Sequence, residues 1–315
     1  MEWYTVPLLA LSLLLIALLS ERVIRYVIVL SKILGLSQMA AGFILLSVTT
    51  SLPELSVSII AASMGEGGLS VGNVLGSNVA NLTIIIGLAV LLSKTAISVK
   101  AESSKELVQF LFISSVIPLF IVQRGSLSPV LGIVLLILFV YFGVTVSHRT
   151  EKTKQNETVE KKASGTIWLK FTISVALIIL FSKLIVDNSV EIAEFAGLPP
   201  SIIGATIVGL GTSLPELVTT AQALKEKMFN MALGNLLGSC ITNITLILGV
   251  SSLISFSTVN VLAVESIMFY VLISSLSVWY MIGTSERISR RGALFLCLVY
   301  IVFVLQQIGV SIFTF

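Results

Sequence analysis

Charge is what this sequence has least of. Only 11% of its 315 residues are Asp, Glu, Lys or Arg, whereas 56% are hydrophobic. A typical soluble domain carries about 25% charged residues, so this chain has too few to cover a water-exposed globule. The same composition excludes a disordered chain, which needs few apolar and many polar residues. The sequence is therefore predicted to be a polytopic membrane protein.

Histidine and cysteine are also nearly missing. The chain has one histidine, His148, and two cysteines, Cys240 and Cys297, which lie in separate apolar stretches. These counts exclude a disulfide framework and a CxxC redox motif. A net charge of +3 does not favour nucleic-acid binding. We expect no cofactor, no nucleic-acid partner and no obligate protein partner. The N-terminal apolar stretch lacks a basic region and a cleavage site, which favours a first membrane span over a signal peptide.

Long apolar stretches recur along the whole chain. A membrane-spanning helix needs roughly 20 mostly apolar residues. We expect ten such spans, near residues 3–33, 37–63, 70–93, 104–122, 127–147, 166–197, 200–224, 230–253, 261–283 and 292–310.

Basic residues lie mainly in alternate connections between these spans. The odd-to-even connections hold almost all the loop lysines and arginines, whereas the even-to-odd connections hold Arg124 alone. Under the positive-inside rule, this asymmetry places both termini outside the cell and the polar linker 148–165 in the cytoplasm. The predicted location is the cell membrane, with the lipid bilayer as surroundings.

One segment of the sequence occurs twice. Residues 42–93 align without gaps to 204–255, and both copies contain Thr-Ser-Leu-Pro-Glu-Leu followed by Gly-Asn-x-Leu-Gly-Ser-x-x-x-Asn. Five expected spans separate the copies, so they enter the membrane from opposite sides. Inverted repeats of this kind place a binding site near the midplane between interrupted helices.

This pattern predicts an all-α polytopic membrane protein. We expect ten transmembrane helices in two inverted-topology five-helix repeats, with broken helices at the midplane. The first repeat half would cover 1–147, the linker 148–165, and the second half 166–315.

Each copy carries one glutamate near the middle of a span. An acidic side chain at that depth costs roughly 2.5–3.5 kcal/mol on insertion scales. Lys183 is the one cation expected to lie deep enough to pair with Glu54 or Glu216. Two carboxylates without such a partner, facing each other, would suit a hard divalent cation.

Proline and small polar residues add oxygens around these glutamates. Pro53 removes a backbone donor and disfavours helix before it, so the second span should break near residues 50–52 and the seventh near 212–214. Such breaks are tolerated at membrane depth where they line a protein cavity. In the third and eighth spans the polar residues share one helix face. That polar face consists of Asn73, Ser77 and Asn81 in the third span and Asn235, Ser239 and Asn243 in the eighth.

Structural roles compete with these functional ones. Ser51 and Glu54 have the spacing of a helix capping box. The asparagine and serine faces could simply join helices by hydrogen bonds. Arg22 and Arg25 fit an interfacial position, and the acidic residues near the end of the sixth span fit a solvated rim.

The duplicated motifs resemble the α-repeats of the sodium/calcium exchanger family. The short linker resembles prokaryotic members. The resemblance implies that Glu54 and Glu216 are shared calcium and sodium ligands. It implies calcium ligands at Glu54, Glu216, Thr50 and Thr212; sodium ligands at these four residues and at Ser51, Ser213, Ser77, Ser239, Ser47 and Gly209; and a central polar pair, Asn81 and Asn243.

The motifs depart from the family pattern at two places. Thr49 stands where a glycine is usual, as at Gly211 in the second copy, and Cys240 replaces the asparagine found at Asn78. Potassium-carrying relatives resemble this chain but have aspartate where Asn243 stands, so potassium dependence is not expected.

The expected function is secondary active antiport of Na⁺ and Ca²⁺ by alternating access. We expect this exchange to be electrogenic. The resemblance implies three sodium ions per calcium and sliding of spans one and six. Proton/calcium exchange on the same scaffold is the main alternative, because facing carboxylates can also trade protons. A passive channel fits a closed midplane site less well, and an intramembrane hydrolase would need a nucleophile–base pair that the sequence lacks, so we expect no enzyme activity.

Overall fold

The computed structural model describes residues 2–33, 46–93, 97–98, 102–148, 164–225, 229–255 and 257–309. The first half contains α1 (Thr5–Ile33), α3 (Leu46–Thr50), α4 (Leu52–Ser63), α5 (Gly67–Ala80), the π-helical turn η2 (Asn81–Ile85), α6 (Ile86–Ser93), β1 (Ile97–Ser98), α7 (Glu102–Val116), α8 (Leu119–Arg124) and α9 (Pro129–His148). The second half contains α10 (Ser164–Ala196), α11 (Pro200–Ile203), the π-helical turns η4 (Gly204–Val208) and η5 (Asn243–Ile247), α12 (Gly209–Thr212), α13 (Leu214–Lys225), α14 (Phe229–Thr242), α15 (Leu248–Ile254), α16 (Val261–Ser285), β2 (Arg287–Ile288) and α17 (Arg290–Gln307).

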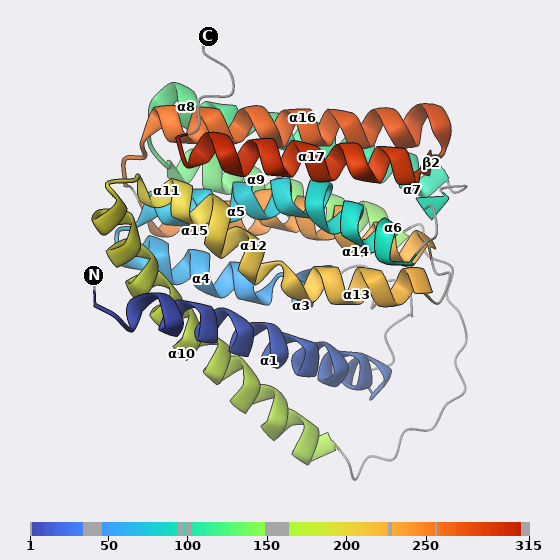
Figure 1. Ribbon diagram of the computed structural model, residues 1–315. Helices are drawn as coiled ribbons and strands as arrows, with labels where there is room; N and C mark the ends of the chain where they lie inside the picture. The colour runs from blue at the N-terminus through green and yellow to red at the C-terminus, as the bar shows by residue number, and fades with distance from the viewer. Residues whose placement is uncertain are drawn as a thin grey trace.

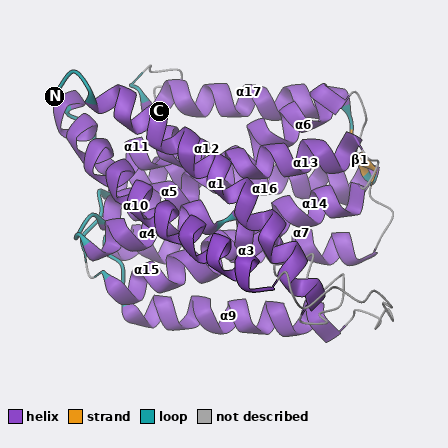
Figure 2. Cartoon of the chain, turned by 90° about the horizontal axis from the view of Figure 1, so that it is seen from below, coloured by secondary structure: helices purple, strands orange, loops and turns teal. Residues whose placement is uncertain are grey.

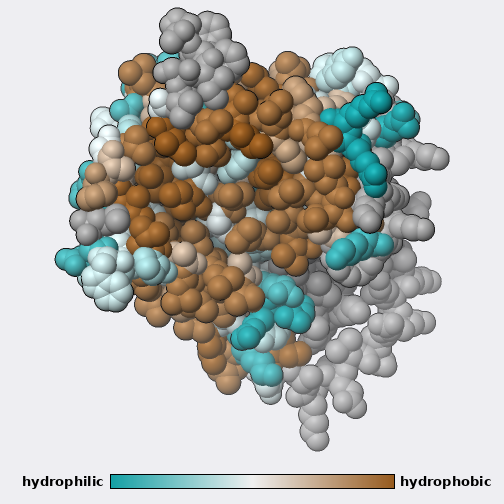
Figure 3. Space-filling view, viewed as in Figure 1, coloured by the Kyte–Doolittle hydropathy of each residue, from teal (hydrophilic) through white to brown (hydrophobic). Residues whose placement is uncertain are grey.

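The helices form one bundle and run roughly side by side (Figure 1). The strands β1 and β2 pair antiparallel at one end of the bundle. Apolar side chains cover the middle of the face in Figure 3, and hydrophilic side chains lie at its two ends. Helices that cross such an apolar belt are what a multi-pass membrane protein requires.

Seven helical segments in the described part of the chain are long and apolar enough to cross a membrane. They are Thr5–Val23, Gly67–Leu92, Gly165–Ala196, Pro200–Lys225, Ala232–Ile254, Val261–Thr284 and Arg290–Gln307. Three shorter apolar helices lie where the second, fourth and fifth spans are expected: Leu52–Ser63, Leu107–Ile121 and Pro129–Thr145.

The expected fourth span, 104–122, is not one continuous helix. Helix α7 ends at Val116 and α8 begins at Leu119, with Pro118 as the N-cap of α8. Proline lacks the amide needed to continue a helical ladder, which accounts for the interruption. Residues 37–45 of the expected second span and most of the linker 148–165 lie outside the described residues.

The two halves have matching helices at the same spacing as the sequence repeat. Helices α4, α5 and the turn η2 in the first half correspond to α13, α14 and η5 in the second. In Figure 1 the chain runs from α3 to α4 toward the left and from α12 to α13 toward the right. The motif-bearing helices therefore run in opposite directions.

Packing between the halves is reciprocal. Helix α3 packs on α14, and its counterpart α12 packs on α5. The last helix of each half behaves in the same way: α9 packs on α15, and α17 packs on α6. Figure 2 shows α9 and α17 along opposite edges of the bundle. The long helices α1 and α10 pack on each other. This exchange brings the two motifs together at the centre.

Two apolar clusters flank that centre. One joins η2 and α6 to α14, with Leu82 and Leu236 among its fully buried members. The other joins α5 to η5, α15, α16 and α17, with Leu75 and Phe303 at its core. The buried polar residues of the two motifs belong to neither cluster.

Candidate ion-binding site

Each motif contains a one-residue helix break. The break falls at Ser51 between α3 and α4, where φ is −85° and ψ is 11°. It falls at Ser213 between α12 and α13, with φ −85° and ψ 8°. Proline follows in the first turn of the next helix, as at Pro53. The breaks predicted from the two prolines are confirmed, and they aim short polar side chains into the bundle.

Two glutamates lie directly after these breaks. Glu54 and Glu216 are each in the first turn of their helix and are fully buried. The Ser213 hydroxyl donates a hydrogen bond to Glu54 Oε1 at 2.8 Å. The Ser51 hydroxyl donates to Glu216 Oε1 at 3.4 Å. Each repeat therefore supplies a hydroxyl to the carboxylate of the other repeat.

The capping-box interpretation of Ser51 is wrong. Ser51 occupies the N-cap position of α4, but its side chain makes no capping hydrogen bond. Its hydroxyl is directed across the bundle to Glu216 instead. The spacing matches a capping box because both arrangements need a polar residue one turn before a glutamate.

Threonines and asparagines form a second set of contacts between the repeats. The Thr50 hydroxyl donates to Asn235 Oδ1 at 3.3 Å, and the Thr212 hydroxyl donates to Asn73 Oδ1 at 3.2 Å. Asn73 in turn donates to the Glu54 backbone oxygen at 3.2 Å. These asparagines join helices, as the structural interpretation of the polar faces predicts. They also hold the threonines against the carboxylates.

The candidate sodium ligands from the sequence meet in the same region. Ser239 Oγ lies 3.1 Å from Thr50 Oγ1. Thr50 also bonds to the Ser47 backbone oxygen at 3.2 Å. Ser77 of the first half donates to the Gly209 backbone oxygen of the second half at 3.1 Å. These hydroxyl and carbonyl oxygens thus gather where the two repeats meet.

Both carboxylates keep one oxygen without a hydrogen-bond partner among the described residues. These atoms are Glu54 Oε2 and Glu216 Oε2, and both are buried. The expected cationic partner does not reach them, because Lys183 is exposed on α10. A cation placed between the two carboxylates would offset the cost of burying them as negative groups.

The central asparagines mark a feature that the sequence did not predict. Asn81 and Asn243 each begin a π-helical turn. Such turns are typical of functional sites, and no periodicity argument finds them. Asn78 is a further member of the site, because it accepts a hydrogen bond from Asn243 at 3.0 Å. The one sequence feature that marks Asn78 is its replacement by Cys240 at the equivalent position of the second repeat.

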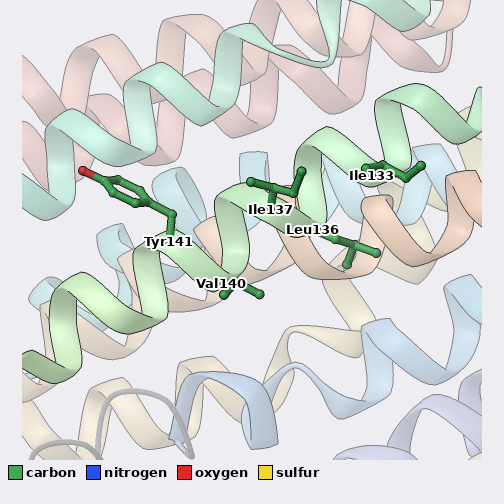
Figure 4. A pocket seen from close by; sticks show the side chains of 5 residues that line it. All are labelled: Ile133, Leu136, Ile137, Val140 and Tyr141. Carbon is green, nitrogen blue, oxygen red and sulfur yellow. The ribbon is translucent and has the colours of Figure 1, made fainter.

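Acidic, histidine and cysteine side chains are sparse among the described residues. No group of three or more His, Cys, Asp or Glu side chains gathers among the described residues. A shallow depression on α9 is lined by apolar side chains and Tyr141, all from one helix (Figure 4). It lacks the carboxylate oxygens that a hard cation needs.

Charged residues on α1 and α10 lie away from the buried centre. Arg22 and Arg25 are exposed, and Arg25 lies 3.6 Å from Glu21. At the far end of α10, Glu191 accepts hydrogen bonds from the Glu2 amide and the Thr5 hydroxyl. That carboxylate links α10 to the start of α1.

This centre can be compared with known proteins. The family model described as sodium/calcium exchanger protein matches residues 4–147 and 166–309. The chain belongs to the sodium/calcium exchanger family. The members of this family are transporters and not enzymes. The chain is therefore assigned to the multi-pass membrane transporters of the cation/calcium exchange class.

Individual relatives agree with this assignment. The chain is 32% identical to a membrane protein of Methanocaldococcus jannaschii over 92% of this chain and 91% of that protein. It is 29% identical to the sodium/calcium exchanger MaX1 of Methanosarcina acetivorans over 90% of this chain and 93% of the relative. A solved structure of the sodium-calcium exchanger NCX_Mj superposes with a TM-score of 0.66 and 26% identity, covering 96% of this chain and 98% of that one.

Proposed function

We propose that the chain is a secondary active antiporter that exchanges Na⁺ for Ca²⁺ by alternating access. The observation that carries this proposal is the pair of buried glutamates, each bonded by a serine from the opposite repeat. A site made equally by two oppositely directed repeats has the same ligands toward either face. This arrangement suits alternating access, in which the repeats move against each other around a fixed site.

Glu54 and Glu216 would be the ligands that both ions share. Calcium would bind the two carboxylates with oxygens from Thr50 and Thr212, since hard cations take six to eight oxygen ligands. Sodium ions would use the same carboxylates and the flanking hydroxyl and carbonyl groups. These flanking groups are Ser51, Ser213, Ser77, Ser239, Ser47 and Gly209, with Asn81 and Asn243 at the centre.

Coupling would follow from charge. One Ca²⁺ neutralises two carboxylates, whereas several Na⁺ ions are needed to do so and to fill the flanking positions. An empty site leaves two buried negative charges, which oppose movement between the two faces. A ratio of three sodium ions per calcium moves net charge, so we propose that exchange is electrogenic.

The membrane arrangement belongs to the same proposal. Ten spans would form two inverted five-helix halves, 1–147 and 166–315. The distribution of basic residues would place the linker 148–165 in the cytoplasm and both termini outside. Cysteine labelling of each terminus in intact cells tests this orientation.

A flux experiment tests the function. Purified protein in sodium-loaded liposomes is diluted into sodium-free buffer at fixed pH, and uptake of radioactive Ca²⁺ is followed. We expect uptake that requires internal Na⁺ and that responds to membrane potential. Glu54→Gln should remove it, while Glu265→Gln, a matched change of an exposed glutamate on α16, should not. Uptake that ignores sodium but follows an imposed pH gradient would replace this proposal with proton/calcium exchange.

A further inference from the structure

Some contacts at the centre are matched between the two repeats, and the contacts around Asn78 and Cys240 are not. The serine–glutamate and threonine–asparagine bonds occur in both directions between the repeats. Asn78 of the first repeat, however, is matched by Cys240 in the second. Any contact made by the Asn78 side chain therefore lacks an equivalent on the other side.

On one side the contact is complete. Asn243 donates from Nδ2 to Asn78 Oδ1 at 3.0 Å. Asn78 then donates from Nδ2 to the Cys240 backbone oxygen at 3.0 Å. The nitrogen of Asn243 is thereby held in place, and its Oδ1 atom has no partner in the described part of the chain. Asn243 is fixed with a carbonyl oxygen available.

On the other side the contact is missing. The repeat symmetry pairs Asn81 with residue 240, as it pairs Asn243 with Asn78. The thiol of Cys240 interacts with the Asn81 amide but makes no hydrogen bond of ordinary geometry to it. Both Asn81 Nδ2 and Asn81 Oδ1 are buried without a partner among the described residues. A thiol is a weak donor and acceptor, so it does not replace the missing amide.

Unsatisfied buried amides are costly and are expected to find a partner. Resting on the proposed function, we propose that Cys240 is a positioning residue that leaves Asn81 untethered. Asn81 then turns its carbonyl oxygen to the cation only when the site is loaded, while Asn243 is oriented in advance. The central site therefore has one fixed and one ion-ordered amide.

Restoring the missing amide tests this assignment. Cys240→Asn should tether Asn81 as Asn78 tethers Asn243, so that its oxygen is oriented before the ion arrives. We expect equilibrium binding of radioactive Ca²⁺ to purified protein to reach half saturation at an about threefold lower concentration, the scale of ordering one side chain in advance. In an Asn81→Ala background the same substitution should cause no shift. Equal shifts in both backgrounds, or no shift in either, would overturn the proposal.

The opposite substitution provides an independent check. Asn78→Cys should release Asn243 and raise the half-saturating Ca²⁺ concentration about threefold, while Cys297→Ala, which removes the distant cysteine on α17, serves as the control. A shift in the same direction for Cys240→Asn and Asn78→Cys would contradict the assignment. Failure of the proposed function is distinguishable from failure of this assignment, because it would appear as missing sodium-driven uptake in the unmodified protein.

Discussion

The two repeats are nearly identical at the glutamates and differ in the residues that support them. Both carboxylates are fully buried and both accept a serine hydroxyl from the opposite repeat. Each motif alone would hold half of these contacts. These paired contacts form only where the repeats meet, so neither half makes them by itself.

The repeats differ at residues other than the two glutamates. Cys240 stands opposite Asn78, and Gly211 stands opposite Thr49. Gly211 lies against Leu13 of α1, because a Cβ atom there would come within 2.7 Å of the leucine side chain. The repeats thus share the proposed ligands and diverge in the residues that contact them. Substitutions can test each level of this comparison.

The largest effect is expected at the shared carboxylates. Glu54→Gln and Glu216→Gln keep the side-chain shape but each removes one of the two negative charges that hold the cation. Both should reduce sodium-driven Ca²⁺ uptake in liposomes below detection, and to the same extent. Retained uptake in one of the two would break the equivalence of the repeats.

A contact between the repeats should matter next. A Cβ atom on Gly76 of α5 would lie 2.2 Å from the Ala205 backbone of η4. Backbone atoms have little room to move, so Gly76→Ala should destabilise the protein by about 1–3 kcal/mol or more.

Thermal unfolding in detergent measures this effect. Gly143→Ala on α9 is the matched control, since a Cβ atom there meets nothing within 4 Å. Equal unfolding temperatures for the two variants would show that α5 and η4 are not in such close contact.

The two serines should differ in the size of their effect. The bond from Ser213 to Glu54 is 2.8 Å long, whereas that from Ser51 to Glu216 is 3.4 Å. Hydrogen bonds weaken with length, and one to a charged group contributes about 1.5–3 kcal/mol. Ser213→Ala should therefore weaken Ca²⁺ binding about tenfold, and Ser51→Ala less. Equilibrium binding with radioactive Ca²⁺ measures both, and a larger loss for Ser51→Ala would reverse the ranking.

The smallest effect is expected at Gly211. Gly211→Ala would push against Leu13, whose flexible end can shift, so exchange should slow only a few-fold. Leu13→Ala added to it should restore part of the rate by removing the obstructing methyl groups. The measurement is the rate of Ca²⁺ uptake by the two single variants and the double variant. Additive losses would mean that the two residues do not meet.

The sequence predicted much of this molecule because its strongest signals are physical requirements of a membrane. A proline before a buried glutamate breaks a helix, and the breaks occur at Ser51 and Ser213 as expected. Repeated motifs at a fixed spacing also bring Glu54 and Glu216 together. These features depend on local backbone chemistry and on symmetry, both of which can be read along the chain.

Other features depend on three-dimensional packing and were not predictable. The π-helical turns that begin at Asn81 and Asn243 leave no mark in apolar periodicity. The direction of the Ser51 hydroxyl was also ambiguous, because a capping bond and a bond across the bundle need the same residue. Which amide Asn78 would contact could be known only after the repeats were placed against each other.

Competition between the two ions at one site is the central claim. The most direct measurement is equilibrium binding of radioactive Ca²⁺ to the purified protein while Na⁺ is raised at constant ionic strength and pH. The account predicts that sodium releases all bound Ca²⁺, with a steep dependence because several sodium ions replace one calcium. Calcium that stays bound at high sodium would show separate sites, and would contradict the shared role of Glu54 and Glu216.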